Sequence, residues 1–259
     1  MKVEASFLRS AASAGDLPRD GLAEIALVGR SNVGKSSLIN ALVRQKIART
    51  SAAPGKTRLV NVYRVQRGAR PRFYLVDLPG YGYARGGDAA ALEFEALMAE
   101  YFGPAGRAGQ EGRSGQVGQE KHVGQQQKRL VKQAGNRTPP VLPSPPGSPA
   151  RSVLLLVDSR HPGLASDLEA WAWVKTAAAR CAVVATKIDK LARGQRIRAT
   201  GELKSVFETS VLPVSAVTGE GLDELWKLID TLVSNPNNPP LPRPRATAPP
   251  RPTKAPRRR

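Results

Sequence analysis

The sequence has a single cysteine and no long apolar run. One cysteine, Cys181, in 259 residues excludes a disulfide framework within the chain and indicates a reducing compartment. No stretch of about eighteen apolar residues occurs, so we expect no membrane span. The N-terminal residues carry scattered charges and lack the apolar core of a signal peptide. These absences predict a cytoplasmic protein.

Acidic residues are also scarce, with 21 Asp and Glu against 40 Lys and Arg, and the formal net charge is +19. Two stretches hold most of this excess: residues 103–151 have a net charge of +6, and residues 235–259 have a net charge of +7. Both are rich in proline and poor in apolar residues, so neither can form a core. We predict a disordered insertion at 103–150 and a disordered tail at 235–259. They either contact RNA phosphates, or they reflect only solubility or lineage-specific drift.

In the rest of the chain, apolar runs alternate with stretches of helical periodicity. Six runs predict strands: an edge strand at Arg58–Val65, and five others at Ile25–Val28, Phe73–Val76, Val153–Val157, Ala182–Ala185 and Val211–Val214. The alternation predicts an α/β domain over residues 23–234, with a mostly parallel six-stranded sheet and helices on both faces. Residues 1–22 are assigned to an N-terminal extension. Ligands of such sheets bind at the carboxyl ends of the strands.

Residues 29–36 match the phosphate-binding loop, in which two glycines five residues apart precede a lysine and a hydroxyl residue. An apolar run precedes the loop, and apolar residues at helical spacing follow it. Backbone N–H groups and the helix dipole thereby converge on an anion. We expect Lys35 to act in catalysis by reaching the β- and γ-phosphates, and Ser36 to bind Mg²⁺. The nucleotide-binding residues predicted here are Gly29, Arg30, Ser31, Asn32, Val33, Gly34, Lys35, Ser36 and Ser37.

A second motif, Asp-x-x-Gly, follows the predicted strand that ends at Val76. In nucleotide switches an aspartate at this place holds Mg²⁺, and the glycine N–H contacts the γ-phosphate. Alone, the tetrapeptide is a common turn, but a position roughly forty residues after a phosphate loop makes it specific. Asp77 is therefore the second predicted Mg²⁺ ligand, and Gly80 is a predicted catalytic residue. The nucleotide contacts expected from this motif come from Asp77, Leu78, Pro79 and Gly80.

Between these motifs lies a Gly-Lys-Thr sequence at residues 55–57. A threonine here can place its hydroxyl on Mg²⁺ and its N–H on the γ-phosphate while GTP is bound, and withdraw after hydrolysis. Thr57 is better placed for this role than Thr50, which lies near the start of the loop. Thr57 is therefore predicted as a catalytic residue and a Mg²⁺ ligand. The nucleotide contacts expected from this segment are Gly55, Lys56, Thr57, Arg58 and Leu59.

Residues 186–189 resemble the Asn/Thr-Lys-x-Asp motif for guanine. Asp189 can accept hydrogen bonds from N1–H and the exocyclic amine of guanine, whereas adenine would leave the carboxylate unpaired. The Lys187 stem can stack over the base. A helix N-cap by Asp189 is the alternative interpretation. Backbone N–H groups of residues 214–216 should contact the guanine oxygen, and the predicted set is Thr186, Lys187, Ile188, Asp189, Val214, Ser215 and Ala216.

Together these motifs resemble those of translation-factor-related GTPases and, more narrowly, the EngB group of bacterial ribosome-biogenesis GTPases. The most specific parts are Leu-Pro-Gly-Tyr-Gly-Tyr at 78–83 and Asp-Ser-Arg-His-Pro at 158–162. The resemblance implies the P-loop GTPase fold of a Ras-like G domain, with GTP or GDP and Mg²⁺ as ligands. It implies a monomer that contacts the large ribosomal subunit or its precursor through rRNA and ribosomal proteins. A requirement for normal septation and cell division is implied too.

Small GTPases often carry a water-orienting glutamine directly after the Asp-x-x-Gly glycine, where this chain has Tyr81. We therefore predict slow intrinsic hydrolysis that a partner or an ion completes. We hypothesise that Asn32 binds a potassium ion, and we therefore predict it as a catalytic residue. Asp158 and His161 have no paired nucleophile, so we interpret them as shaping a turn.

Three function classes compete. The first is a GTP-driven switch in large-subunit assembly. The second is a protein-binding GTPase that times cell division without direct ribosome contact. The third, an ATP-using metabolic enzyme, is disfavoured by Asp189 and by the absence of a second substrate motif.

Overall fold

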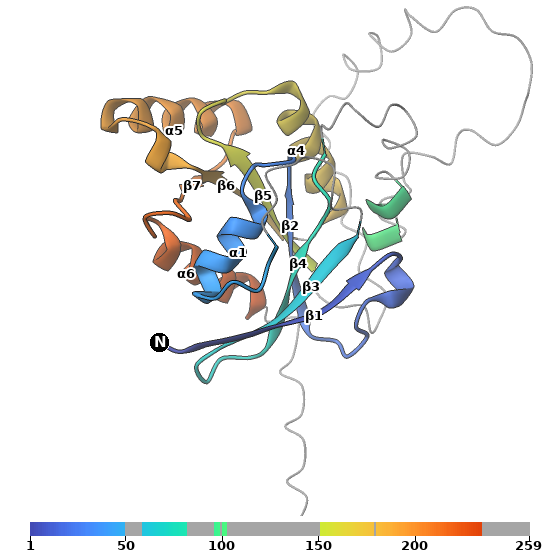
Figure 1. The fold of residues 1–259 in the computed structure, drawn as a ribbon. Helices are drawn as coiled ribbons and strands as arrows, with labels where there is room; N and C mark the ends of the chain where they lie inside the picture. Colours follow the sequence, from blue (N-terminus) through green and yellow to red (C-terminus); the bar gives the residue numbers. More distant parts are fainter. Residues whose placement is uncertain (50–58, 82–95, 99, 103–150, 179, 235–259) are drawn as a thin grey trace, which may run out of the picture.

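The structure is a computed structural model of the chain, drawn in Figure 1. It describes residues 1–49, 59–81, 96–98, 100–102, 151–178 and 180–234. In these ranges a single sheet of seven strands lies between two layers of helices. The α/β architecture with a mostly parallel sheet is thus confirmed.

The strand order is β1-β3-β4-β2-β5-β6-β7. β3 runs antiparallel to both of its neighbours, β1 and β4, and the other neighbouring pairs are parallel. The strands are β1 Val3–Ala11, β2 Ala23–Gly29, β3 Val60–Arg67, β4 Phe73–Asp77, β5 Arg151–Asp158, β6 Arg180–Thr186 and β7 Val211–Pro213.

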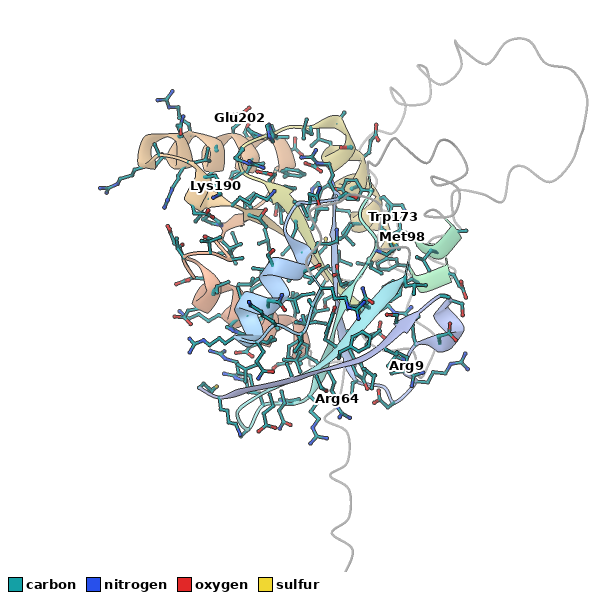
Figure 2. All side chains as sticks on the ribbon, viewed as in Figure 1. Arg9, Arg64, Met98, Trp173, Lys190 and Glu202 are labelled. Atoms are coloured by element: carbon teal, nitrogen blue, oxygen red, sulfur yellow. The ribbon has the colours of Figure 1, made fainter. Side chains whose placement is uncertain are left out.

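Helices cover both faces of the sheet. Their bounds are α1 Lys35–Val43, α4 Ala165–Ala177, α5 Arg193–Phe207 and α6 Leu222–Val233, with short 3₁₀ turns at Ala14–Asp16 and Ile188–Lys190. α1 and α6 pack on one face, and α4 and α5 pack on the other with Met98, Tyr101 and Phe102. Figure 2 labels Met98 and Trp173 on this second side, where both belong to one apolar cluster. None of the helices in the described ranges is long and apolar enough to cross a membrane.

β2 illustrates how the sequence produces this layering. Ile25 and Leu27 pack with α1 and α6, whereas Ala26 and Val28 pack with α4 and α5. Because both faces of a central parallel strand are covered, its sequence is a continuous apolar run. Burying one large aliphatic side chain contributes about 1.5–3 kcal/mol. The buried side chains of β2 therefore fix the position at which the following loop begins.

Two predictions about the sheet edge were wrong. The sheet has seven strands instead of six, because Val3–Ala11, which we assigned to an N-terminal extension, pairs with β3 as the edge strand β1. The predicted edge strand is consequently internal. A register shift between Phe7 and Arg9 interrupts the alternation of β1, so exposed and half-buried side chains do not follow a period of two. This irregularity hid the strand from a pattern-based prediction.

Glu24, near the start of β2, joins two distant parts of the chain. It is 1% exposed and accepts hydrogen bonds from Tyr101 Oη at 2.8 Å and from Arg151 Nε at 3.0 Å. Arg151 also donates to the Tyr101 carbonyl and lies 4.6 Å from the centroid of its ring. We call these three residues the Glu24 clasp. It brings the residues that flank 103–150 together at the end of β2 opposite Gly29.

Candidate functional site

The loop between β2 and α1 contains two residues in the left-handed backbone region. Asn32 has φ 62°, Gly34 has φ 111°, and α1 begins at the next residue. At the end of β2, a Cβ on Gly29 would lie only 2.7 Å from the Leu156 carbonyl oxygen of β5. The tight turn leads directly into a helix whose first N–H groups have no intrahelical acceptor, which is the arrangement that binds phosphate.

Lys35 is held over this loop. Its Nζ donates to the carbonyl oxygens of Gly29 at 2.9 Å and Arg30 at 3.3 Å, and the residue is 9% exposed. Burial lowers the pKa of Lys35, and the charge of Asp77 opposes that shift. A buried ammonium group is costly unless an anion neutralises it. The loop thus presents a cation that a phosphate would stabilise.

Asp77 ends β4 and lies beside the first turn of α1. Ser36 Oγ donates to Asp77 Oδ2 at 3.1 Å, whereas the buried Oδ1 has no hydrogen-bond partner among the described residues. Burial raises the pKa of Asp77, opposed by Lys35 and Ser36. Mg²⁺ prefers oxygen ligands. The hydroxyl, the carboxylate and its unpaired oxygen therefore fit Mg²⁺, which when bound would neutralise charge on the β- and γ-phosphates.

The segment after Asp77 lies against the phosphate loop. Ser31 donates its backbone N–H to the Tyr81 carbonyl at 3.2 Å and its hydroxyl to the Gly80 carbonyl at 3.4 Å. A Cβ on Gly80 would lie 2.6 Å from the Ser31 nitrogen. Because no side chain fits here, glycine is required for this close approach. Gly80 is therefore next to the loop in which phosphate binding was predicted.

The end of β6 contacts the same loop from the other side. Thr186 Oγ1 donates to the Val33 carbonyl at 2.7 Å, and Lys187 Nζ donates to the Asn32 carbonyl at 2.5 Å. Lys187 itself has φ 61°. Two motifs far apart in the sequence are thus hydrogen-bonded to each other.

Asp189 lies in the 3₁₀ turn after Lys187, with its carboxylate held in place. Ser215 Oγ donates to Oδ1 at 2.7 Å, and Lys190 Nζ lies 3.6 Å from Oδ2. Burial opposes ionisation, but these contacts outweigh it and lower the pKa of Asp189. The N-cap alternative is wrong: the residue preceding the 3₁₀ turn is Lys187, and the residue preceding α5 is Ala192. A charged acceptor is thereby available for donors on a base.

Ser215 anchors the loop after β7. It is fully buried, and its Oγ accepts the backbone N–H groups of Val217 at 3.2 Å and Thr218 at 3.0 Å. Its predecessor Val214 donates to the Ala185 carbonyl at 2.7 Å. The predicted base-contacting segments, 186–189 and 214–216, are therefore neighbours.

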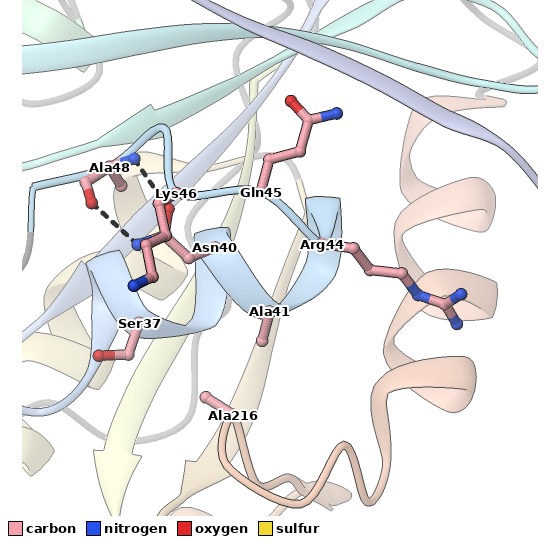
Figure 3. Close-up of a pocket in the computed structure, with 8 residues that line it drawn as sticks. All are labelled: Ser37, Asn40, Ala41, Arg44, Gln45, Lys46, Ala48 and Ala216. Atoms are coloured by element: carbon pink, nitrogen blue, oxygen red, sulfur yellow. Dashed lines mark hydrogen bonds between the residues drawn. The ribbon is translucent and has the colours of Figure 1, made fainter.

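A hollow of about 510 Å³ lies on the flank of α1. Figure 3 draws the residues that line it. Ser37 and Ala216, predicted from separate motifs, both line it. The Asn40 side chain closes the turn after α1 by bonding both backbone groups of Ala48 at 2.8 Å. No motif pointed to this turn. The other lining residues are Asn40, Ala41, Arg44, Gln45, Lys46 and Ala48.

Asp158, interpreted above as part of a turn, supports the base-contacting segment directly. It accepts hydrogen bonds from Lys187 Nζ at 2.9 Å and from Arg160 Nη2 at 2.7 Å. Burial opposes ionisation, but these donors outweigh it and lower the pKa of Asp158. The carboxylate is fully engaged, which fits a structural role for this residue.

The structure gathers the described site residues at the carboxyl ends of β2, β4, β6 and β7. The predicted residues Gly55, Lys56, Thr57 and Arg58 lie outside the described residues, so their contacts stay predictions. Leu59, next to them, is 42% exposed. Of the three predicted Mg²⁺ ligands, Ser36 and Asp77 lie in the described ranges and are hydrogen-bonded to each other.

Comparison with known proteins agrees with this geometry. A family model described as 50S ribosome-binding GTPase matches residues 24–103. Among solved structures, Aquifex aeolicus Era bound to GDP·AlF₄⁻ has a TM-score of 0.56 at 20% identity, covering 83% of this chain and 58% of that one. A probable GTP-binding protein EngB has a TM-score of 0.50 at 18% identity, covering 82% of this chain and 98% of that one. The fold and the match define a P-loop GTPase.

Sequence relatives narrow this class. The probable GTP-binding protein EngB of Lacticaseibacillus casei is 35% identical over 226 residues, which is 85% of this chain and 91% of that protein. The protein of the same name in Thermotoga maritima is 35% identical over 234 residues, or 89% and 96%. The chain belongs to the EngB family of GTP-binding proteins. It is accordingly a GTPase that uses GTP, GDP and Mg²⁺.

Proposed function

We propose that this GTPase is a switch that assists assembly of the large ribosomal subunit. The observation that carries the proposal is the match of residues 24–103 to a family described as 50S ribosome-binding GTPases. Era, of whose chain 58% is covered by the match, has been solved in complex with nucleotides 1506–1542 of 16S ribosomal RNA. A cell short of ribosomes cannot sustain division, which would link this function to septation.

In the proposed nucleotide complex, each motif has a separate task. Lys35 binds the β- and γ-phosphates, the Gly80 N–H contacts the γ-phosphate, and Asp189 binds guanine. The charged carboxylate of Asp189 and the buried Lys35 support these assignments. Thr57 is proposed to complete the Mg²⁺ site when GTP is bound.

Hydrolysis by the isolated protein is proposed to be slow. Tyr81 follows Gly80, where many GTPases have a water-orienting glutamine. Its hydroxyl donates to Asp167 at 2.8 Å, and its side chain packs with the core beside α4. A hydroxyl engaged in this way does not orient an attacking water. A partner or a potassium ion held by Asn32 would then complete the site.

The basic stretches 103–151 and 235–259 are proposed to add contacts to rRNA phosphates. Such contacts are insensitive to sequence and weaken as salt rises, because binding releases counterions from the RNA. Their net charges of +6 and +7 support this assignment. Solubility alone is the competing explanation.

Sedimentation of cell extract through sucrose gradients tests the proposal, with a non-hydrolysable GTP analogue or GDP at low and moderate salt. We expect co-migration with large-subunit particles only in the GTP-like state. Deleting residues 235–259 should make this co-migration weaker and less steeply dependent on salt, because fewer phosphate contacts remain. A protein that stays at the top of the gradient in every state would overturn the ribosome assignment. It would favour instead a GTPase that times cell division through protein partners.

A further inference from the structure

A buried cluster outside the sequence motifs connects the phosphate loop to the residue after Gly80. Asp167, in the first turn of α4, is 1% exposed. Its Oδ1 accepts a hydrogen bond from Tyr81 Oη at 2.8 Å and lies 3.2 Å from Arg30 Nε. Arg30 belongs to the phosphate loop, so one carboxylate joins three separate segments of the chain.

The position of Asp167 suits a carboxylate that must stay charged. A negative charge in the first turn of a helix interacts favourably with the helix dipole. Burial raises the pKa of Asp167, and the hydrogen bond from Tyr81 and the charge of Arg30 oppose that shift. The ionised carboxylate therefore depends on the two partners that it joins.

The cluster also determines where Gly80 lies. Tyr81 is anchored at both ends: its hydroxyl by Asp167, and its carbonyl by the Ser31 N–H at 3.2 Å. Arg30 and Tyr81 form a parallel bridge between the phosphate loop and the segment after β4. Gly80, between Asp77 and Tyr81, is thus pressed against Ser31 with no room for a Cβ.

We propose that Asp167 is a positioning residue which, through Tyr81 and Arg30, holds Gly80 beside the phosphate loop before nucleotide binds. This inference rests on the proposed contact between the Gly80 N–H and the γ-phosphate. A donor that is already in place costs less ordering entropy when the ligand arrives. The benefit applies to a triphosphate and not to GDP, which has no γ-phosphate. The cluster therefore raises the affinity for GTP relative to the affinity for GDP.

Removing one hydroxyl tests this role. In Tyr81→Phe the ring is kept and only the bond to Asp167 is lost. We expect binding of a non-hydrolysable GTP analogue to weaken about tenfold, which corresponds to about 1.4 kcal/mol, while GDP affinity changes less than about twofold. Asp167→Asn keeps an oxygen for Tyr81 but loses the charge that faces Arg30, so a smaller loss of the same kind is expected. Equilibrium titration with fluorescent nucleotides measures both affinities.

Tyr74→Phe is the matched control. Tyr74 Oη donates to Asp20 Oδ2 at 2.7 Å, so this variant removes the same kind of bond at the start of β4, away from Gly80. It should leave the GTP-to-GDP preference unchanged, and melting temperatures measured for all variants separate folding from positioning.

Equal weakening of GDP and GTP-analogue binding in Tyr81→Phe would overturn the positioning role and leave a structural bond only. Unchanged affinities for both nucleotides would overturn it as well. Failure of the proposed nucleotide site is recognised separately, because the unmodified protein would then show no preference for guanine over adenine nucleotides.

Discussion

The carboxylates at the two ends of the nucleotide site have pKa values shifted in opposite directions. At the base end, Asp189 and Asp158 have lowered pKa values because hydrogen-bond donors and cations surround them. At the phosphate end, burial raises the pKa of Asp77, and one of its oxygens has no hydrogen-bond partner in the described ranges. Lys35, beside it, is also shifted toward its neutral form. The base end is complete without a ligand, whereas the phosphate end contains charges that a ligand would stabilise.

This difference indicates which part of the site gains more free energy when the nucleotide and Mg²⁺ bind. A pre-formed base end would bind guanine with little rearrangement, because Ser215 and Lys190 already hold the Asp189 carboxylate in place. The phosphate end gains most from anion and metal, since each compensates a buried charge. Substitutions at the base end should therefore change the discrimination between bases. Substitutions at the phosphate end should change the dependence on Mg²⁺.

Lys35→Ala is expected to have the largest effect. Without the ammonium group, the γ-phosphate charge in the transition state loses its nearest cation, and kcat/KM for GTP should fall about 10³-fold. Steady-state phosphate release measures the change. The control is Lys204→Ala on the exposed side of α5, for which kcat/KM should stay at the unmodified value. If kcat/KM of Lys35→Ala falls less than tenfold, Lys35 is not the main cation that the phosphate end offers to the γ-phosphate.

Asp189→Asn should weaken GTP binding about 10²-fold, because two hydrogen bonds to a charged acceptor are lost. An asparagine amide can donate to the C2 carbonyl of xanthine, so affinity for xanthosine triphosphate should rise. Competition titrations with both nucleotides test this exchange. Equal losses for the two nucleotides would mean that Asp189 does not read the base.

Asp77→Asn should stabilise the nucleotide-free, Mg²⁺-free protein by about 2–4 °C, the shift that about 1 kcal/mol produces in a domain of this size. The folded-state pKa of Asp77 is raised, so its ionised form disfavours folding once the pH exceeds that pKa. The stabilisation should therefore grow from acid to neutral pH. Thermal melts with and without Mg²⁺ should also show that the variant no longer responds to the metal.

Asp158→Asn is the counterpart and should change stability in the other direction. Its folded-state pKa is lowered, so its contribution is present above the ordinary aspartate pKa and is lost as the pH falls through the folded value. The same melts should show destabilisation at neutral pH that fades in acid. If Asp77→Asn and Asp158→Asn shift the melting temperature in the same direction, the proposed contrast between the two ends is wrong.

Replacing residues 103–150 by a short Gly/Ser linker should have the smallest effect, with nucleotide affinities within about twofold of the full chain. The Glu24 clasp keeps Tyr101 and Arg151 together, so the linker has little distance to span. Titration with GDP is the measurement. A large loss of affinity would show that the insertion contributes to the site.

The sequence motifs anticipated the parts of the fold and site that local patterns encode. A buried parallel strand has its own apolar signature, and the glycines of the phosphate loop are required by a tight turn at fixed spacing. The motifs also identified Ser36 and Asp77, which the structure joins at 3.1 Å.

The parts that were missed depend on contacts between remote residues. The bulged edge strand β1 lacks clean alternation and is recognised only through its pairing with β3. Asp167 and Arg30 are 137 positions apart in the numbering, and nothing in the local sequence around α4 marks a partner for the phosphate loop. The support that Asp158 gives to Lys187 has the same origin, since two neighbouring strands place them together.

The Glu24 clasp has a consequence for how this chain can change in length. The entropic cost of closing a loop rises by only about 0.6 kcal/mol each time the loop doubles in length. A loop of about fifty residues therefore costs roughly 2 kcal/mol more to close than a loop of about six. A charged hydrogen bond to a buried carboxylate can offset much of that. Because Tyr101 and Arg151 lie together at this one point, a change in the number of residues between them need not alter any path through the core. We therefore expect this end of β2 to tolerate segments that are gained, lost or exchanged, while the nucleotide site at the opposite end of the strand is preserved.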